Sequence, residues 1–160
     1  MLLAAMAMSC AVSVAHAQSA TAASTATVVT PLVVTGTAPL AFGVVFPGIN
    51  KTVLFNAASS GRISLSGFGN AQVSLTFTLP TALSNGGTTM PINNYRVRAN
   101  GTNVTAGATR IFVTSGVAVN RNLVNGTLFL FIGGRVQPAA AQAGGSYTAP
   151  IVLAAAYTGL

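Results

Sequence analysis

Apolar and hydroxyl-bearing side chains alternate strictly over residues 73–79 (VSLTFTL). A period of two puts every apolar side chain on one face of an extended chain, so this segment predicts a strand with one buried face. Residues 62–66 alternate in the same way over a shorter span. Residues 95–98 (YRVR) predict a strand on which both arginines, Arg96 and Arg98, face outward.

Three other segments predict strands with less regular patterns. Residues 128–132 (LFLFI) are apolar on both faces, which is typical of a central strand covered on both sides. Residues 28–35 are rich in β-branched side chains, and Pro31 within them favours an edge strand. Residues 41–46 continue the strand-like pattern up to a predicted turn at Pro47-Gly48.

Tight turns are predicted at three Asn-Gly pairs, each of which is expected to close a hairpin: Asn85-Gly86, Asn100-Gly101 and Asn125-Gly126. The Ala-rich residues 139–143 follow a proline and run into two glycines, so they predict a loop instead of a helix. Short strands between frequent turns, without helices, indicate a sandwich or a barrel. A membrane barrel would need aromatic girdles, whereas this chain has three Tyr and no Trp. We therefore expect an all-β, immunoglobulin-like antiparallel β-sandwich.

The N-terminal residues 1–17 form an apolar run that ends in Ala15-His16-Ala17, the pattern cleaved from exported proteins. This run predicts a signal peptide and places the protein in the periplasm, on the cell surface or outside the cell. Lipidation at Cys10 is an alternative with a poor flanking sequence. Residues 18–27 predict a flexible segment or donor strand, and residues 28–160 the β-sandwich domain. No later run has the ~20 apolar residues of a transmembrane segment.

The composition limits the chemistry of the chain. It contains no Asp or Glu, and its one His and one Cys both lie in the predicted signal peptide. Acid–base catalysis, hydrolytic triads and metal sites rely mainly on these four residue types, so we expect no catalytic, cofactor-binding or metal-binding residues and no enzyme activity. Lys51 could serve as a base only if it were buried, and the turn-like run before it predicts that it is exposed.

The formal net charge is +7, and all seven basic residues follow the predicted signal peptide. They are Lys51, Arg62, Arg96, Arg98, Arg110, Arg121 and Arg135. Nucleic acid is not an expected partner, because the basic residues are scattered and no nucleic-acid-binding motif accompanies them. Arg96 and Arg98, which share one strand face, are the candidate contacts for an anionic ligand.

Two stretches together resemble a known family. Residues 28–48 have a Pro-Leu strand, a loop and an aromatic-glycine step closed by Pro-Gly, and residues 142–159 carry two tyrosines around an apolar closing strand. This resembles the secreted bacterial domain of unknown function 4402, which is similar to spore-coat-U and fimbrial-subunit domains. The resemblance implies an exported immunoglobulin-like sandwich that assembles into filaments. The chain departs from many fimbrial subunits in lacking a cysteine pair.

These observations predict a non-enzymatic structural subunit of a surface or fimbria-like assembly. Self-association, or association with other surface subunits, would use β-strand addition, with residues 18–30 as the candidate donor. On that segment Ala20, Ala22, Ala26 and Val28 fall on one face. The alternative is a surface module that binds acidic polysaccharide or lipopolysaccharide through Arg96 and Arg98.

Overall fold

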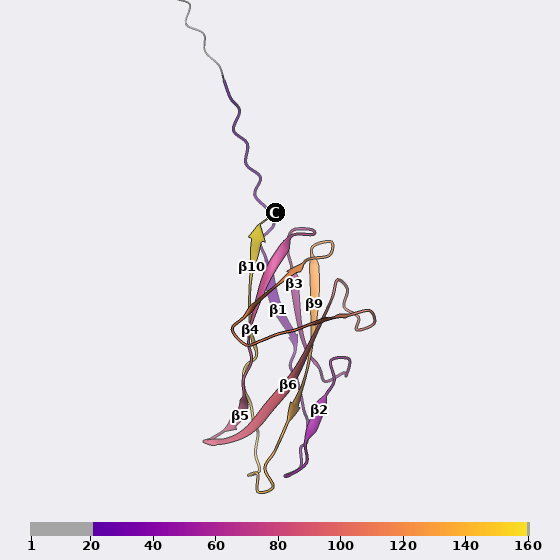
Figure 1. Ribbon diagram of the computed structural model, residues 1–160, viewed down its shortest axis with the longest axis vertical. Coiled ribbons are helices and arrows are strands. Elements are labelled where there is room, and N and C mark those ends of the chain that lie inside the picture. The colour runs from indigo at the N-terminus through magenta and orange to yellow at the C-terminus, as the bar shows by residue number, and fades with distance from the viewer. Residues whose placement is uncertain (1–20, 160) are drawn as a thin grey trace, which may run out of the picture.

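The computed structural model describes residues 21–159, and the predicted signal peptide lies outside them. The described residues form strands and no helix, which confirms the all-β prediction (Figure 1). In this part of the chain, no helix offers the length and apolar character needed to cross a membrane. The strands are β1 (Val33–Ala38), β2 (Lys51–Val53), β3 (Gly61–Ser66), β4 (Gln72–Thr78), β5 (Ala82–Asn85), β6 (Thr88–Asn100), β7 (Thr109–Ile111), β8 (Ala118–Asn122), β9 (Thr127–Val136) and β10 (Val152–Gly159).

The strands form two antiparallel sheets. The larger sheet has the order β1-β3-β9-β6-β5, with β2 also paired to β9 and β7 also paired to β6. The smaller sheet has the order β10-β4-β8. The two sheets enclose one main apolar core between them, an arrangement consistent with the predicted β-sandwich.

The alternating pattern of residues 73–79 correctly identifies the strand that fills this core. Val73, Leu75 and Phe77 on β4 are each fully buried. Residues 128–132 are also confirmed as a central strand, because β9 lies between β3 and β6. Its inward residues Leu128, Leu130 and Ile132 join the core.

The N-terminal edge of the larger sheet differs from the prediction. The first strand begins at Val33, so Pro31 precedes it and residues 28–32 pair with no strand. Residues 41–46 are not a strand either, because Gly43 has a φ of 61°, which interrupts an extended chain. The predicted turn at Pro47-Gly48 is present, with Gly48 at a φ of 73°.

The three Asn-Gly turns have three different outcomes. Asn85-Gly86 closes the β5–β6 hairpin as predicted. Asn100-Gly101 begins a longer reversal, since β6 pairs with β7 only after residues 101–108. Asn125-Gly126 is a tight turn with positive φ at both positions, and it closes a single antiparallel bridge between Val124 and Thr127. The hairpin extends no further, because β8 and β9 belong to different sheets.

Candidate functional site

Arg96 and Arg98 lie on the outer face of the larger sheet, as their alternation with the fully buried Val97 predicts. Their surroundings differ. Arg96 is exposed, whereas Arg98 is half-buried and donates a hydrogen bond from Nη1 to the carbonyl oxygen of Ala108 over 2.9 Å. The guanidinium of Arg98 also stacks over the ring of Phe55, 4.5 Å from its centroid. Arg98 is therefore held in place, whereas Arg96 reaches into solvent.

Strand pairing adds two arginines that the sequence did not connect with Arg98. Arg62 on β3 pairs with Phe131 on β9, Phe131 pairs with Arg98 on β6, and Arg98 pairs with Arg110 on β7. The three arginines thus follow one line across four strands, which we call the arginine row. Phe131 lies between Arg62 and Arg98 and is fully buried on this outer face.

The arginine row combines positive charge with aromatic rings. The Arg62 guanidinium lies 5.7 Å from the ring centroid of Phe131, and that of Arg110 lies 4.4 Å from the ring centroid of Phe112. Because the chain contains no Asp or Glu, no side-chain carboxylate neutralises these cations. The row can therefore attract anionic groups, for which guanidinium is a geometrically suited partner.

The second notable feature is the edge of the smaller sheet formed by β10. Within residues 21–159, β10 pairs only with β4, and β1 at the facing edge of the larger sheet pairs only with β3. The inward-facing residues of β10, Leu153, Ala155 and Tyr157, pack against the main core but remain partly exposed. We call the opening between β1 and β10 the open seam.

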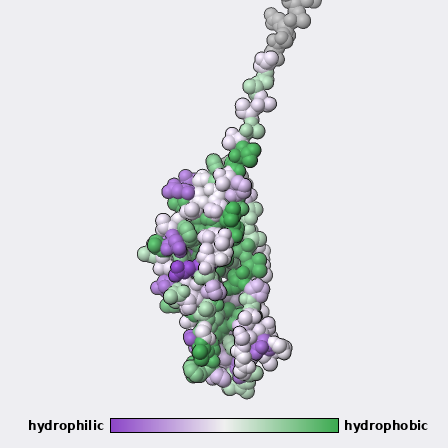
Figure 2. All heavy atoms as spheres, turned by 180° about the vertical axis from the view of Figure 1, so that it is seen from behind, coloured by the Kyte–Doolittle hydropathy of each residue, from purple (hydrophilic) through white to green (hydrophobic). Residues whose placement is uncertain are grey.

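The open seam is visible as an apolar stripe. Figure 2 shows hydrophobic atoms gathered in a band along the right-hand side of the body, which is the side of β10 in this reversed view. Ile63 on β3 is also only partly buried, although it packs against the main core. The seam thus exposes core side chains together with the unpaired backbone groups of an edge strand.

The opposite edge of the smaller sheet is better protected. There, Arg121 on β8 donates hydrogen bonds to the carbonyl oxygens of Asn120 and of Arg110, the latter in the other sheet, over 3.4 and 3.5 Å. A charged residue on an edge strand opposes the addition of another strand. The β10 sequence VLAAAYTG has no charged residue, so β10 lacks that protection.

The Tyr157 side chain bridges the open seam near the C-terminal end of β10. The Tyr157 hydroxyl donates a hydrogen bond to the carbonyl oxygen of Thr30 over 2.8 Å and accepts one from the backbone N–H of Phe68 over 2.7 Å. Tyr157 thereby connects β10 to the chain that enters β1. Beyond this point residues 21–28 are exposed and lead away from the body, next to the C-terminal end of β10 (Figure 1).

The remaining candidates for chemistry are few. Lys51 is exposed, as predicted, and donates a hydrogen bond to the carbonyl oxygen of Val44 over 2.8 Å. Tyr95 donates to the carbonyl oxygen of Pro80 over 2.7 Å, and burial raises the pKa of its phenol to about 12. Within residues 21–159 no three potential metal-binding His, Cys, Asp or Glu side chains lie together.

No family model matches the sequence, and no curated protein matches it either. The resemblance to the domain of unknown function 4402 therefore stays a prediction.

Proposed function

We propose that the protein is an exported, non-enzymatic structural subunit of a surface or fimbria-like assembly. Its copies join by β-strand addition, in which the candidate donor, residues 18–30, extends from its anchor at Thr30 into the open seam of the next copy. The observation that carries this proposal is the unprotected edge of β10 above partly exposed core residues. A strand added there forms backbone hydrogen bonds with β10 and covers Leu153 and Ala155.

The donor segment has properties that suit this role. Residues 21–28 are exposed and form no strand in their own chain, so they are free to pair elsewhere. Ala22, Ala26 and Val28 share one face of the extended segment.

The direction of the N-terminal segment favours a partner over the same chain. Thr30 is held by Tyr157, and Pro31 follows immediately, so the segment would have to reverse sharply to reach its own open seam. The contact between the donor segment of one copy and the open seam of the next is head-to-tail. Such a contact repeats into a filament unless it closes into a ring.

The remaining parts of the proposal rest on sequence and strand order. The apolar residues 1–17 support export to the periplasm, the cell surface or the exterior. The facing sets β1-β3-β9-β6 and β10-β4-β8 support an immunoglobulin-like arrangement, and with it the kinship to fimbrial-subunit domains.

Electron microscopy of the purified chain from Gln18 onward tests this proposal. We expect filaments or rings, and we expect them to be lost when residues 18–27 are removed. Ala22→Asp with Ala26→Asp should also abolish assembly, because both charges face the core of the partner. The matched control, Ala23→Asp with Thr27→Asp, adds the same charges to the opposite face and should still assemble. Equal assembly by both charged pairs, or monomers at all concentrations, would overturn the proposal.

The arginine row favours a second candidate function, a surface module for acidic polysaccharide or lipopolysaccharide. Arg62, Arg98 and Arg110 lie in one line without carboxylate partners, and Arg96 extends from the same face. Binding of heparin, a sulfated polysaccharide, should weaken with added salt and fall when Arg96 and Arg98 are replaced by Met. Replacing Lys51 and Arg121 by Met, both outside the arginine row, removes the same two charges and is the matched control. Binding that is insensitive to salt, or equal loss in the control, would exclude this function.

A further inference from the structure

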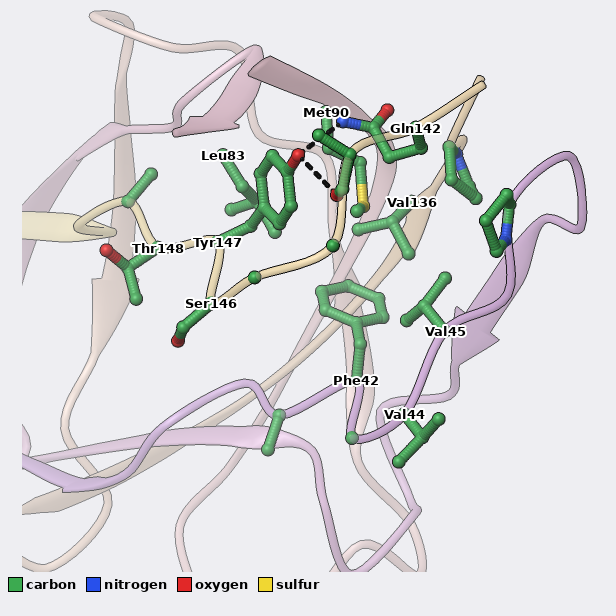
Figure 3. A pocket seen from close by; sticks show the side chains of 18 of the residues that line it. Phe42, Val44, Val45, Leu83, Met90, Val136, Gln142, Ser146, Tyr147 and Thr148 are labelled. Atoms are coloured by element: carbon green, nitrogen blue, oxygen red, sulfur yellow. Dashed lines mark hydrogen bonds between the residues drawn. The ribbon is translucent and has the colours of Figure 1, made fainter. Parts of the chain in front are cut away.

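A cavity of about 670 Å³ lies at the end of the open seam where β1 ends and β10 begins, because its lining includes Pro39 and Leu40 and extends to Ala149. It is an open cavity lined by residues 39–45 and 142–149, by Pro47 and Pro138, and by side chains of β5, β6 and β9. Figure 3 shows Phe42, Val45, Leu83, Met90, Val136 and Tyr147 around it. Its volume falls within the ~300–1,000 Å³ typical of small-molecule sites.

The walls of this cavity belong to a second, smaller apolar cluster. Met90, Ile92 and Val136 are its buried members, whereas Phe42 and Val45 pack against them and stay partly exposed. An apolar cluster in a folded domain normally closes on itself. Here a cavity remains between the loop that carries Phe42 and Val45 and the segment of residues 142–149.

Several polar groups in the cavity wall bind one another around the Tyr147 hydroxyl. The Tyr147 hydroxyl donates to the carbonyl oxygen of Ala143 over 2.8 Å and accepts from Nε2 of Gln142 over 2.8 Å (Figure 3). Thr88 Oγ1 lies 3.1 Å from the same hydroxyl. These bonds fix the wall that carries the Tyr147 ring, while Ser146 and Thr148 add further polar groups beside the apolar side chains.

One cation lies at the rim. Lys51 Nζ donates to the carbonyl oxygen of Val44 and lies 3.8 Å from the position that a Cβ on Gly43 would take, and both Val44 and Gly43 line the cavity. The Lys51 ammonium has no carboxylate side chain as a partner, because the chain contains no Asp or Glu. The cavity thus offers apolar walls for an alkyl chain and a single positive charge for an anionic head.

We infer that this cavity binds a single-chain amphiphile with an acidic head group, such as a fatty acid. The alkyl chain lies between Phe42, Val136 and Tyr147, and the carboxylate pairs with Lys51 at the rim. A neutral apolar molecule contacts the cavity walls equally well but forms no ion pair with Lys51. A second copy of the chain is the other occupant that the test distinguishes.

Calorimetric titration of the chain from Gln18 with sodium laurate and with dodecanol tests the inference. Laurate should bind at one site and more tightly than dodecanol. Lys51→Met should weaken laurate binding by up to about fivefold, the upper end for an exposed ion pair, and leave dodecanol binding unchanged. Lys51→Arg should retain the preference for laurate. Equal affinities for the two ligands, or no effect of Lys51→Met, would overturn the role of the acidic head.

A blocking variant separates cavity binding from adsorption elsewhere. Gly144 lines the cavity, and a Cβ placed on it meets no atom within 4 Å, so Gly144→Leu adds a side chain without a backbone clash. This variant should abolish laurate binding while the protein stays folded. Gly69→Leu, outside the cavity and with its nearest neighbour at 3.9 Å, is the matched control and should bind normally. No laurate binding by the folded protein, or loss of self-association with Gly144→Leu instead, would overturn the inference.

Discussion

The hydroxyl of Tyr157, near the end of β10, donates a hydrogen bond to the carbonyl oxygen of Thr30, which lies 127 residues earlier in the chain. It also accepts a hydrogen bond from Phe68, so one side chain joins the last strand, the entry to β1 and the loop after β3. The contact fixes the point at which the N-terminal segment leaves the body. It therefore links the stability of the fold to the direction of the proposed donor segment.

Replacing Tyr157 by Phe removes both hydrogen bonds and keeps the ring. We expect the free energy of unfolding to fall by about 1–2 kcal/mol, because the Phe68 N–H and the Thr30 carbonyl lose their partner. Chemical denaturation measures the change. Gly67→Ala provides a coupled test, since its added Cβ would collide with the Tyr157 hydroxyl. The cost of Gly67→Ala should be smaller in a protein that already carries Tyr157→Phe. Additive effects would contradict the described geometry.

The two arginines of β6 should contribute unequally to stability. Arg98→Met loses the hydrogen bond to Ala108 and the cation–aromatic contact with Phe55, at a cost of about 1–2 kcal/mol. Arg96→Met, two residues away on the same face, removes an exposed side chain and should change stability by no more than ~0.5 kcal/mol. Thermal and denaturant unfolding of both variants measure the difference. An equal cost for the two would show that the arginine row is not anchored at Arg98.

Stability should be nearly independent of pH in the acid range. Acid unfolding usually follows the protonation of carboxylates and the charging of buried histidines, and from Gln18 onward the chain has neither side chain. The free energy of unfolding should therefore stay constant from about pH 9 down to about pH 4, near which the C-terminal carboxyl begins to take up a proton. Denaturant titrations at several pH values measure it. A steep loss between about pH 6 and pH 4 would contradict this expectation.

At alkaline pH, the ionisation of Tyr95 should lower the free energy of unfolding. Burial raises the pKa of Tyr95 from 10.0 to about 12, so the folded protein keeps the phenol proton at a pH where the unfolded chain releases it. This stabilisation is fully present below about pH 10 and is lost as the pH rises to about 12. Absorbance titration of the phenols and unfolding at each pH measure the effect. Tyr95→Phe should flatten the stability curve in that range, and an unchanged slope would contradict the assignment.

The sequence predicts local structure well where one pattern decides it. Alternation identifies Val73, Leu75 and Phe77 as core, and the apolar run of residues 128–132 identifies a central strand. Prediction from the sequence fails where contacts between residues far apart in the chain decide the structure. Pro31 lies outside β1, next to Thr30, whose carbonyl bonds to Tyr157 near the other end of the chain. Asn125-Gly126 turns the chain from one sheet into the other.

The candidate sites, too, could be predicted only where a local pattern decides their structure. The outward position of Arg96 and Arg98 follows from alternation with Val97, but Arg62 and Arg110 join them only through the pairing of four strands. The open seam also depends on strand order, because no local pattern tells which edge of β10 lacks a partner. Charge gives a partial signal, since β8 carries Arg121 and β10 carries no charged residue.

Hydrogen exchange of the chain lacking residues 18–27, measured with and without a synthetic peptide of residues 18–30, tests strand addition most directly. The peptide should bind with one-to-one stoichiometry and slow the exchange of backbone amides in β10, while β8 at the other edge of the same sheet is unaffected. A peptide carrying Ala22→Asp and Ala26→Asp should give no protection. Unchanged exchange in β10, or equal protection of β8, would contradict the claim that the open seam accepts the N-terminal strand of another copy.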